Sequence, residues 1–295
     1  MNNNVETFLA STGSRVEEYA VADLAACGRS KVTEAALYAV RAGGKRLRPA
    51  LVFAAASALS PRREFENDPS LLATAAAFEY IHTYSLIHDD LPVMDNDDLR
   101  RGKPSCHIAF GVETAVRAGA LLIVRAFHAV DGIDSPARIA IIEALTEASG
   151  VRGMVGGQAL DILGETRAAS TDELVRIHSM KTAALIRGAI VAGALAAEAD
   201  ANRIRAMKEI GSATGLAFQI IDDLLDVEST AEEKGKPVGR DGEHGKRTYP
   251  SVMGIDASRR RARELIETAE HGLIDLGKQD TILWDLIRFV FHRKR

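Results

Sequence analysis

The sequence predicts an all-α fold, and three observations support that prediction. Alanine and leucine, which favour helices, are abundant, whereas aromatic residues make up 5% of the 295 residues. Apolar residues recur at spacings of three and four, as in LLATAAAFEYIHTYSLI and LVRIHSMKTAALIRGAIVAGAL. Alternating β-branched runs are nearly absent, and no strand–turn–strand pattern occurs. We therefore expect a single all-α domain over residues 1–295, built from about ten or more helices.

Local signals predict where several helices begin and end. Asp68 followed by Pro69 marks a helix start, because aspartate caps backbone N–H groups and proline suits the first helical position. Pro92 ends or kinks that helix, since proline cannot donate a backbone hydrogen bond. Further along, Ser170 and Glu173 have the spacing of a capping box that opens another helix.

Composition limits the classes of function. The net charge is −4, which argues against bulk attraction to nucleic acid or anionic lipid. The two cysteines, Cys27 and Cys106, argue against a disulfide scaffold and fit a reducing compartment. The N-terminus lacks the basic and apolar regions of a signal peptide, and stretches such as PALVFAAASAL are too short to span a bilayer. These features predict a cytoplasmic protein.

Two acidic clusters stand out from this background. The stretch HDDLPVMDNDDLRRGKP, residues 88–104, holds five aspartates in ten positions: Asp89, Asp90, Asp95, Asp97 and Asp98. The helix dipole and like-charge repulsion disfavour such a cluster at the end of a helix, so a solvated acidic loop is one interpretation. The stretch FQIIDDLLDVE holds a second cluster in apolar surroundings, which favours cation binding instead. Magnesium is the natural cation, because it prefers oxygen and is held by carboxylates together with substrate phosphates.

The predicted metal ligands come from both clusters: Asp89, Asp90, Asp95, Asp222, Asp223 and Asp226. Asp222 and Asp226 are four residues apart and share a helix face. Asp89 and Asp95 are six apart and do not share a face of a regular helix. We therefore expect the backbone to bulge or unwind near Pro92.

Basic residues flank both clusters: Lys45, Arg46, Arg48, Arg100, Arg101, Lys181, Lys236 and Lys246. Arginine grips phosphate oxygens in a fork, and lysine acts as a point charge. Any one of them alone is more often a solvated surface cation, and GGK does not fit a P-loop. Together they predict two anionic groups, one bound through metal and the other held directly by cations. Lys236 and Lys246 lie in the polar, glycine-rich segment 229–249, the best candidate for a mobile lid.

The motifs resemble those of the trans-isoprenyl diphosphate synthases, most closely the bacterial farnesyl diphosphate synthases. The similarity covers about residues 25–292 and rests on six stretches: GGKRLRP, IHTYSLIHDDLPVMDNDDLRRGKP, GMVGGQALD, HSMKTAALI, FQIIDDLLD and GKRTYP. The two aspartate motifs, DDxxxxD and DDxxD in this order, are highly specific. The resemblance implies an isoprenoid synthase-type helical bundle around a deep central cavity, a homodimer, and three magnesium ions per active site.

The implied reaction joins isopentenyl diphosphate head to tail to an allylic diphosphate. Farnesyl diphosphate is the expected main product, and geranylgeranyl diphosphate is the alternative. The resemblance assigns catalytic roles to Asp89, Asp90, Arg100, Lys181, Thr182, Gln219, Asp222 and Lys236. Within this set, Thr182 and Gln219 supply oxygen dipoles near the carbocation. The isopentenyl diphosphate contacts implied are Lys45, Arg48, His82 and Arg101, and Lys246 is a further substrate-binding residue.

Product length is predicted to depend on Tyr84 and Ser85. Tyr84 lies five residues before Asp89, roughly 7–8 Å deeper at about 1.5 Å per helical residue. By resemblance, an aromatic ring at this position closes the end of the cavity and goes with a fifteen-carbon product. The alternative is that Tyr84 is an ordinary core residue. His82 shares a face with Ser85 and Asp89, which favours ligand contact over a core role. Gln158 also matches the family, either as a direct contact or as an orienting residue.

The chain departs from the family at residues 118–122, where AGALL stands in place of AGDALL. Ala120 replaces an aspartate, and Arg117 stands where an apolar residue is usual. We expect these changes to affect rate or dimer packing without removing a named ligand. Two alternative functions predict different residues at these motifs. A terpene cyclase would not need Lys45, Arg48 and Arg101, and a non-catalytic regulatory subunit would be expected to lose motif aspartates.

Overall fold

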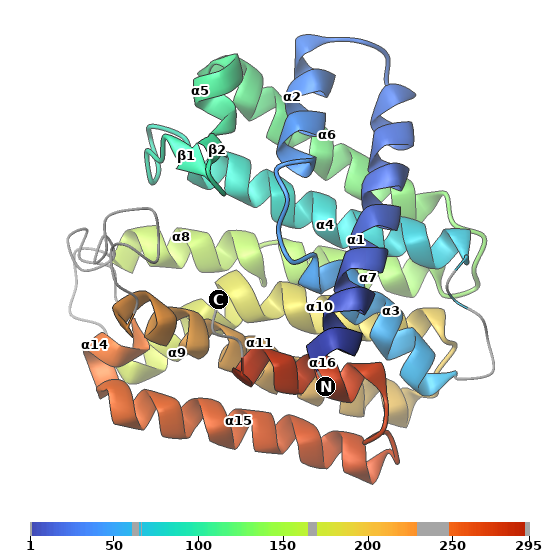
Figure 1. The fold of residues 1–295 in the computed structure, drawn as a ribbon, viewed down its shortest axis with the longest axis vertical. Helices are drawn as coiled ribbons and strands as arrows, with labels where there is room; N and C mark the ends of the chain where they lie inside the picture. The colour runs from blue at the N-terminus through green and yellow to red at the C-terminus, as the bar shows by residue number, and fades with distance from the viewer. Residues whose placement is uncertain (1, 61–64, 66, 165–169, 229–247, 293–295) are drawn as a thin grey trace.

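Helices form nearly all of the structure, a computed structural model that describes residues 2–60, 65, 67–164, 170–228 and 248–292 (Figure 1). The first half contains α1 (Asn2–Ala25), α2 (Lys31–Val40), α3 (Leu47–Leu59), α4 (Pro69–Asp89), α5 (Cys106–Phe110), α6 (Val112–Asp131) and α7 (Arg138–Ser149). The second half contains α8 (Met154–Gly164), α9 (Thr171–His178), the π-helix η1 (Ser179–Ala183), α10 (Ala184–Ala196), α11 (Ala201–Glu228), α14 (Tyr249–Met253), α15 (Ile255–Asp275) and α16 (Ile282–His292). The predicted all-α fold is confirmed.

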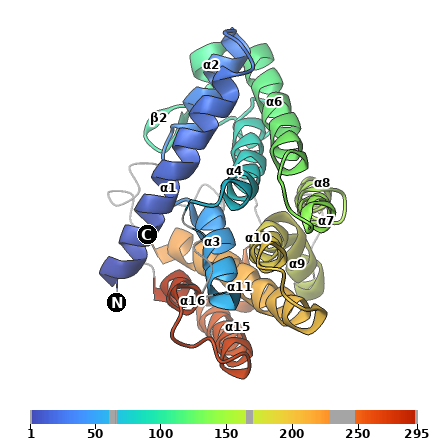
Figure 2. The ribbon, with the colours of Figure 1, turned by 90° about the vertical axis from the view of Figure 1, so that its right-hand side faces the viewer.

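The helix α4 is the central element that positions the first aspartate motif. It packs against α1, α3, α6 and α10, and Figure 2 shows it between α1 and α6. The helix α10 packs in turn against α3, α7 and α11, and α11 packs against α15 and α16. Small residues are fully buried on both α3 and α4, among them Ala54, Ala55, Ala75 and Ala76. The α4 helix is therefore a rigid support for the side chains at its C-terminal end.

The predicted helix boundaries have the expected physical causes. The Asp68 side chain accepts hydrogen bonds from the backbone N–H groups of Ser70 and Leu71, at 2.9 and 3.1 Å, and so caps α4. The helix ends at Asp89, three residues before the proline that was expected to end or kink it. Ser170 Oγ accepts a hydrogen bond from Glu173 N at 3.2 Å, which confirms Ser170 as the N-cap of α9.

One apolar helix runs from Thr171 to Ala196 through α9, η1 and α10. Among the described residues it alone is long and apolar enough to cross a membrane by length and composition. However, 67% of its most apolar window is buried, and α10 packs against α3, α7 and α11. Such burial is typical of a core helix.

A short hairpin follows the first aspartate motif, where no strand pairing was predicted. Its strands are β1 (Leu99–Arg100) and β2 (Lys103–Pro104), paired antiparallel. The two turn residues, Arg101 and Gly102, have φ values of 54° and 75°. Positive φ at both central positions is typical of the type I′ turn, which matches the twist of a hairpin. The strands have two residues each, so they carry no periodic signal.

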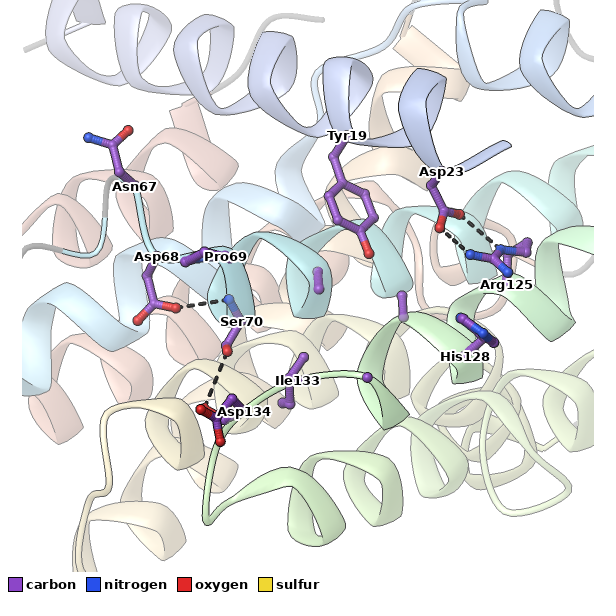
Figure 3. Close-up of a pocket in the computed structure, with 13 residues that line it drawn as sticks. Tyr19, Asp23, Asn67, Asp68, Pro69, Ser70, Arg125, His128, Ile133 and Asp134 are labelled. Atoms are coloured by element: carbon purple, nitrogen blue, oxygen red, sulfur yellow. Dashed lines mark hydrogen bonds and ion pairs between the residues drawn. The ribbon is translucent and has the colours of Figure 1, made fainter. Parts of the chain in front are cut away.

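An ion pair ties the N-terminal helix to the rest of the bundle. Asp23 of α1 pairs with Arg125 of α6, whose Nε donates at 3.0 Å, and Tyr80 Oη of α4 donates to Asp23 at 3.0 Å. Figure 3 shows this pair at the wall of a cavity of about 790 Å³ between α1, the start of α4 and the end of α6. None of the predicted site residues that the structure describes lines this cavity.

Candidate active site

A cavity of about 610 Å³, here called the acidic cavity, opens between α4, α8, η1 and α11. Both aspartate motifs reach it, through Asp89 on α4 and Asp222 on α11. Its other predicted site residues are Arg48, His82, Tyr84, Ser85, Lys181, Thr182 and Gln219. The fold therefore brings together side chains that are up to 174 positions apart in the sequence, between Arg48 and Asp222.

A smaller pocket of about 260 Å³, here called the cationic pocket, adjoins the acidic cavity. It is lined by all four residues that the family resemblance assigned to isopentenyl diphosphate: Lys45, Arg48, His82 and Arg101. Arg48, His82 and Phe218 line both spaces and form their shared wall. Phe289 of α16 also lines the cationic pocket, and its ring centroid lies 5.6 Å from Lys45 Nζ. No local motif marks Phe289, so sequence reasoning missed it.

The chain folds back immediately after Asp89. The Asp95 backbone N–H donates a hydrogen bond to the Asp89 carbonyl at 2.8 Å, which explains how two residues six apart approach each other. Gln158 Nε2 of α8 donates to Asp89 Oδ1 at 3.0 Å. Burial raises the pKa of the Asp89 carboxyl to about 6, with Lys181 opposing the rise and Asp95 adding to it. A bound cation would relieve this cost of ionising Asp89.

Asp90 lies differently from its predicted placement. It is buried, and the Arg100 guanidinium binds its carboxylate, with Nε donating to Oδ1 at 3.0 Å. Neither Asp90 nor Arg100 lines the acidic cavity. In this geometry the two residues pair with each other, and the roles predicted for them, metal binding for Asp90 and catalysis for Arg100, stay predictions.

The second motif also divides its aspartates between two faces. Asp222 is exposed and lines the acidic cavity, and Asp226 follows one turn later, half-buried. Asp223 is buried and does not line the cavity. Its carboxylate accepts hydrogen bonds from Gln219 Nε2 at 2.7 Å and from the Tyr249 backbone N–H at 2.9 Å. The metal-ligand role of Asp223 stays a prediction, and in this structure its carboxylate is held by Gln219 and Tyr249.

Lys181 and Thr182 belong to the π-helix η1, where sequence periodicity predicted an uninterrupted helix. Such wide turns are rare and occur frequently at functional sites. The turn is accommodated by Gly157 of α8, where a Cβ atom would lie 2.2 Å from Lys181 N. Lys181 Nζ donates to Asp161 at 2.5 Å, and Thr182 Oγ1 donates to Gln219 Oε1 at 2.6 Å. The wide turn thus places two adjacent side chains on the cavity wall.

His82 is neutral in this setting. Burial holds the pKa of its imidazole well below the ordinary value, and the positive charges of Arg48 and Arg101 lower it further. A neutral imidazole offers one donor and one acceptor nitrogen. His82 can therefore contact a ligand in the cationic pocket without adding to the charge there.

The acidic ligands do not form a closed metal site by themselves. Among the described residues, no three His, Cys, Asp or Glu side chains converge on one point. The carboxylates come instead from two different helices that line the acidic cavity, Asp89 from α4 and Asp222 from α11. Carboxylate oxygens are the donors that magnesium prefers, and substrate phosphates and water commonly complete its coordination. The donor chemistry of Asp89 and Asp222 therefore fits magnesium.

Comparison with known proteins identifies the family. The family model for polyprenyl synthetase matches residues 29–279. The chain belongs to the polyprenyl synthetase family. Farnesyl diphosphate synthase from Geobacillus stearothermophilus is 44% identical over 252 residues, which is 83% of each chain. The resemblance predicted from the motifs is thereby confirmed.

Solved structures agree with this assignment. The fold is similar to that of an FPP/GFPP synthase from Zymomonas mobilis, with a TM-score of 0.84 and 34% identity over 99% of both chains. It is also similar to a geranyltransferase from Helicobacter pylori that was solved with magnesium and isoprenyl diphosphate. That structure gives a TM-score of 0.82 and 29% identity, covering 97% of this chain and 96% of the other.

Two features of this polyprenyl synthetase bear on the remaining predictions. Lys236, Lys246 and the predicted lid, except its last two residues, lie outside the described residues. The departure at Ala120 lies on α6, where the side chain is exposed and lines neither the acidic cavity nor the cationic pocket. Arg117 is also exposed and pairs with Glu113 at 2.7 Å. Neither change alters a residue of the described site.

Proposed function

We propose that this polyprenyl synthetase makes farnesyl diphosphate, by condensing isopentenyl diphosphate with dimethylallyl diphosphate and then with geranyl diphosphate. One observation carries the proposal: the cationic pocket adjoins a cavity that both aspartate motifs reach, and Arg48, His82 and Phe218 form the wall between them. A terpene cyclase would need only the cavity. A regulatory subunit would not need both Asp89 and Asp222 in the lining of the acidic cavity.

The residues of the acidic cavity and those of the cationic pocket would bind different diphosphates. Asp89 and Asp222 would hold magnesium, and we propose three ions per active site. When bound, magnesium supplies positive charge that stabilises the departing diphosphate. Lys181 adds a further cation to the lining of the acidic cavity. In the cationic pocket, Lys45, Arg48, His82 and Arg101 would hold isopentenyl diphosphate. Lys246, which lies outside the described residues, is proposed as a further substrate-binding residue.

The carbocation left by ionisation needs a dry cavity and fixed dipoles. Thr182 and Gln219 carry oxygen atoms on the cavity wall, and the hydrogen bond between them fixes their orientation. Fixed dipoles stabilise developing charge without reorganising during the reaction. The proton lost in the last step goes to the released diphosphate, so the mechanism requires no side-chain base.

Product length follows from the depth of the acidic cavity. Tyr84 is 7% exposed, lines the cavity, and lies on α4 five residues before Asp89. Its ring would stop a growing chain at fifteen carbons, which favours farnesyl over geranylgeranyl diphosphate. We expect Tyr84→Ala to lengthen the product by at least one five-carbon unit.

The test is to supply the pure protein with magnesium, isopentenyl diphosphate and, in turn, each allylic diphosphate, and to identify products by chain length. Farnesyl diphosphate from dimethylallyl and geranyl diphosphate is the expected result. Turnover without isopentenyl diphosphate would indicate a cyclase instead. Failure of the chain alone to turn over any substrate pair would favour a regulatory subunit.

We further propose that the enzyme is a cytoplasmic homodimer whose subunit is one all-α domain. The exposed apolar side chains of Val116, Val124 and Ile139 on α6 and α7 support an association surface there. The free thiols of Cys27 and Cys106 fit a reducing compartment. Light scattering during size-exclusion chromatography tests the dimer.

A further inference from the structure

We propose that His88 is a positioning residue for Tyr84 and thereby a determinant of product length. The inference rests on the proposed function, because it concerns the floor of the acidic cavity. Both side chains line that cavity. Their rings meet edge to face, with centroids 5.6 Å apart and an interplanar angle of 72°. Aromatic rings favour this geometry because the positive edge of one meets the negative face of the other.

His88 is itself held from the neighbouring helix. Its Nε2 lies 3.1 Å from the Val116 carbonyl of α6, and since a carbonyl only accepts, Nε2 carries the proton. Gly119 comes one turn later on α6, and a Cβ atom there would lie 2.2 Å from His88 Nε2. The imidazole therefore fits between α4 and α6 only because residue 119 has no side chain.

These contacts form a chain of support from α6 to the cavity floor. The Val116 carbonyl and the space at Gly119 fix His88, and His88 limits the rotation of the Tyr84 ring. Without His88, the Tyr84 ring would lose this ring contact and could rotate about its side-chain torsions. A fixed ring presents the same stop to every growing chain, whereas a released ring leaves room for another five-carbon unit.

Gly119 allows the inference to be tested without changing α4. A direct His88→Ala substitution lies next to Asp89 and could also alter the rate. Gly119→Ala displaces the imidazole from α6 and leaves the whole aspartate motif unchanged. Gly132→Ala is the matched control at the end of the same helix, since a Cβ there would meet its nearest atom, the His128 carbonyl, at 3.5 Å.

The experiment compares the products of these full-length variants under the conditions used for the wild type. His88→Ala and Gly119→Ala are expected to raise the ratio of twenty-carbon to fifteen-carbon product several-fold, and Gly132→Ala to leave it unchanged. Circular dichroism confirms that each variant is folded. If Gly119→Ala fails to fold, His88→Ala carries the comparison.

A double variant separates positioning from a general loosening of the core. If His88 acts through Tyr84, adding His88→Ala to Tyr84→Ala will not lengthen the product beyond that of Tyr84→Ala alone. An additive lengthening overturns the positioning role, as does an unchanged product ratio in both His88→Ala and Gly119→Ala. A wild-type product longer than fifteen carbons would overturn the farnesyl assignment instead, while a shift relative to that product would still support the role of His88.

Discussion

The side-chain amide of Gln219 donates a hydrogen bond to Asp223 Oδ1 at 2.7 Å, and this bond gives the two adjacent aspartates of the second motif different tasks. Successive residues of an α-helix point about 100° apart. Asp222 consequently lines the acidic cavity, while Asp223 faces the core and also accepts the Tyr249 backbone N–H. With its amide nitrogen held by Asp223, Gln219 keeps its carbonyl oxygen toward Thr182.

Substitutions of Asp222 and Asp223 should therefore have different effects on the kinetics. Asp222→Asn is expected to raise the magnesium concentration needed for half-maximal turnover. Asp223→Asn is expected to lower kcat while leaving the magnesium requirement near that of the wild type. The two donors bind different oxygens of Asp223, and the NH2 group of asparagine cannot accept the second bond. Magnesium titrations of turnover measure this difference. Equal shifts in the magnesium requirement would show that Asp223 is a ligand after all.

Removing the metal should abolish activity without unfolding the protein. Full chelation, Asp89→Ala or Asp222→Ala is expected to cut turnover by several orders of magnitude, since uncompensated carboxylates would repel a diphosphate. Helical content by circular dichroism should remain that of the wild type, because neither side chain belongs to the apolar core. Near-normal turnover in excess chelator would contradict the metal-dependent mechanism.

The two diphosphates should respond to different substitutions. Lys45 lines only the cationic pocket and Lys181 only the acidic cavity, whereas Arg48 lines both. We expect Lys45→Ala mainly to raise the KM for isopentenyl diphosphate and Lys181→Ala mainly to slow turnover of the allylic partner. Arg48→Ala should affect both. Steady-state kinetics with each substrate varied in turn provide the test, and identical effects of Lys45→Ala and Lys181→Ala would refute separate sites.

Restoring the family aspartate on α6 should be tolerated. Ala120 is exposed and lies outside both spaces of the site. Surface substitutions usually change stability by less than about 0.5 kcal/mol, so we expect Ala120→Asp to leave activity within about tenfold or to raise it. The readout is turnover together with the oligomeric state. A large loss of activity accompanied by dissociation would instead place Ala120 within an adapted subunit interface.

Acid should destabilise the protein in part through His178. Burial lowers the pKa of this imidazole to about 4, below its usual 6.5. The unfolded chain thus takes up a proton first, and the stability that His178 contributes above pH 6.5 is lost as the pH falls toward 4. At about 1.4 kcal/mol per pH unit, the loss at pH 5 is about 2 kcal/mol.

Urea unfolding at pH 7 and pH 5 tests this contribution against a His178→Gln variant. The free energy of unfolding should fall less between the two pH values in the variant, because glutamine does not titrate. The other acid-sensitive groups are shared by the two proteins and cancel in the comparison. Equal decreases in the wild type and the variant would exclude His178 as the source.

Much of the fold was predictable because its signals are local. The N-caps at Asp68 and Ser170 depend on one side chain and the two or three residues after it. Pro92 is a local signal of the same kind, and it predicted the end of α4. The apposition of the two aspartate motifs came from the family resemblance, since no local rule brings Asp89 and Asp222 to one cavity.

The remaining features depend on contacts between distant segments. Asp223 carries the same charge as Asp222, and only the positions of Gln219 and Tyr249 reveal its different task. Asp90 likewise has a different environment from Asp89, because its carboxylate binds the guanidinium of Arg100, a residue of the hairpin strand β1. The π-helix lies close against α8 at Gly157, a contact between distant segments that helical periodicity cannot indicate.

The π-helix also determines which changes in chain length this enzyme can accept. A π turn takes up one more residue than the α turn it replaces. Deleting a single residue between Ser179 and Ala183 would let the helix close into regular α turns and keep its length nearly unchanged. Because the wide turn and the α turn that replaces it each complete one rotation, α9 and α10 would keep their relative orientation, while the positions of Lys181 and Thr182 within the turn would change. A sequence shortened by one residue here would therefore keep the helical bundle while changing how Lys181 and Thr182 are presented to the acidic cavity.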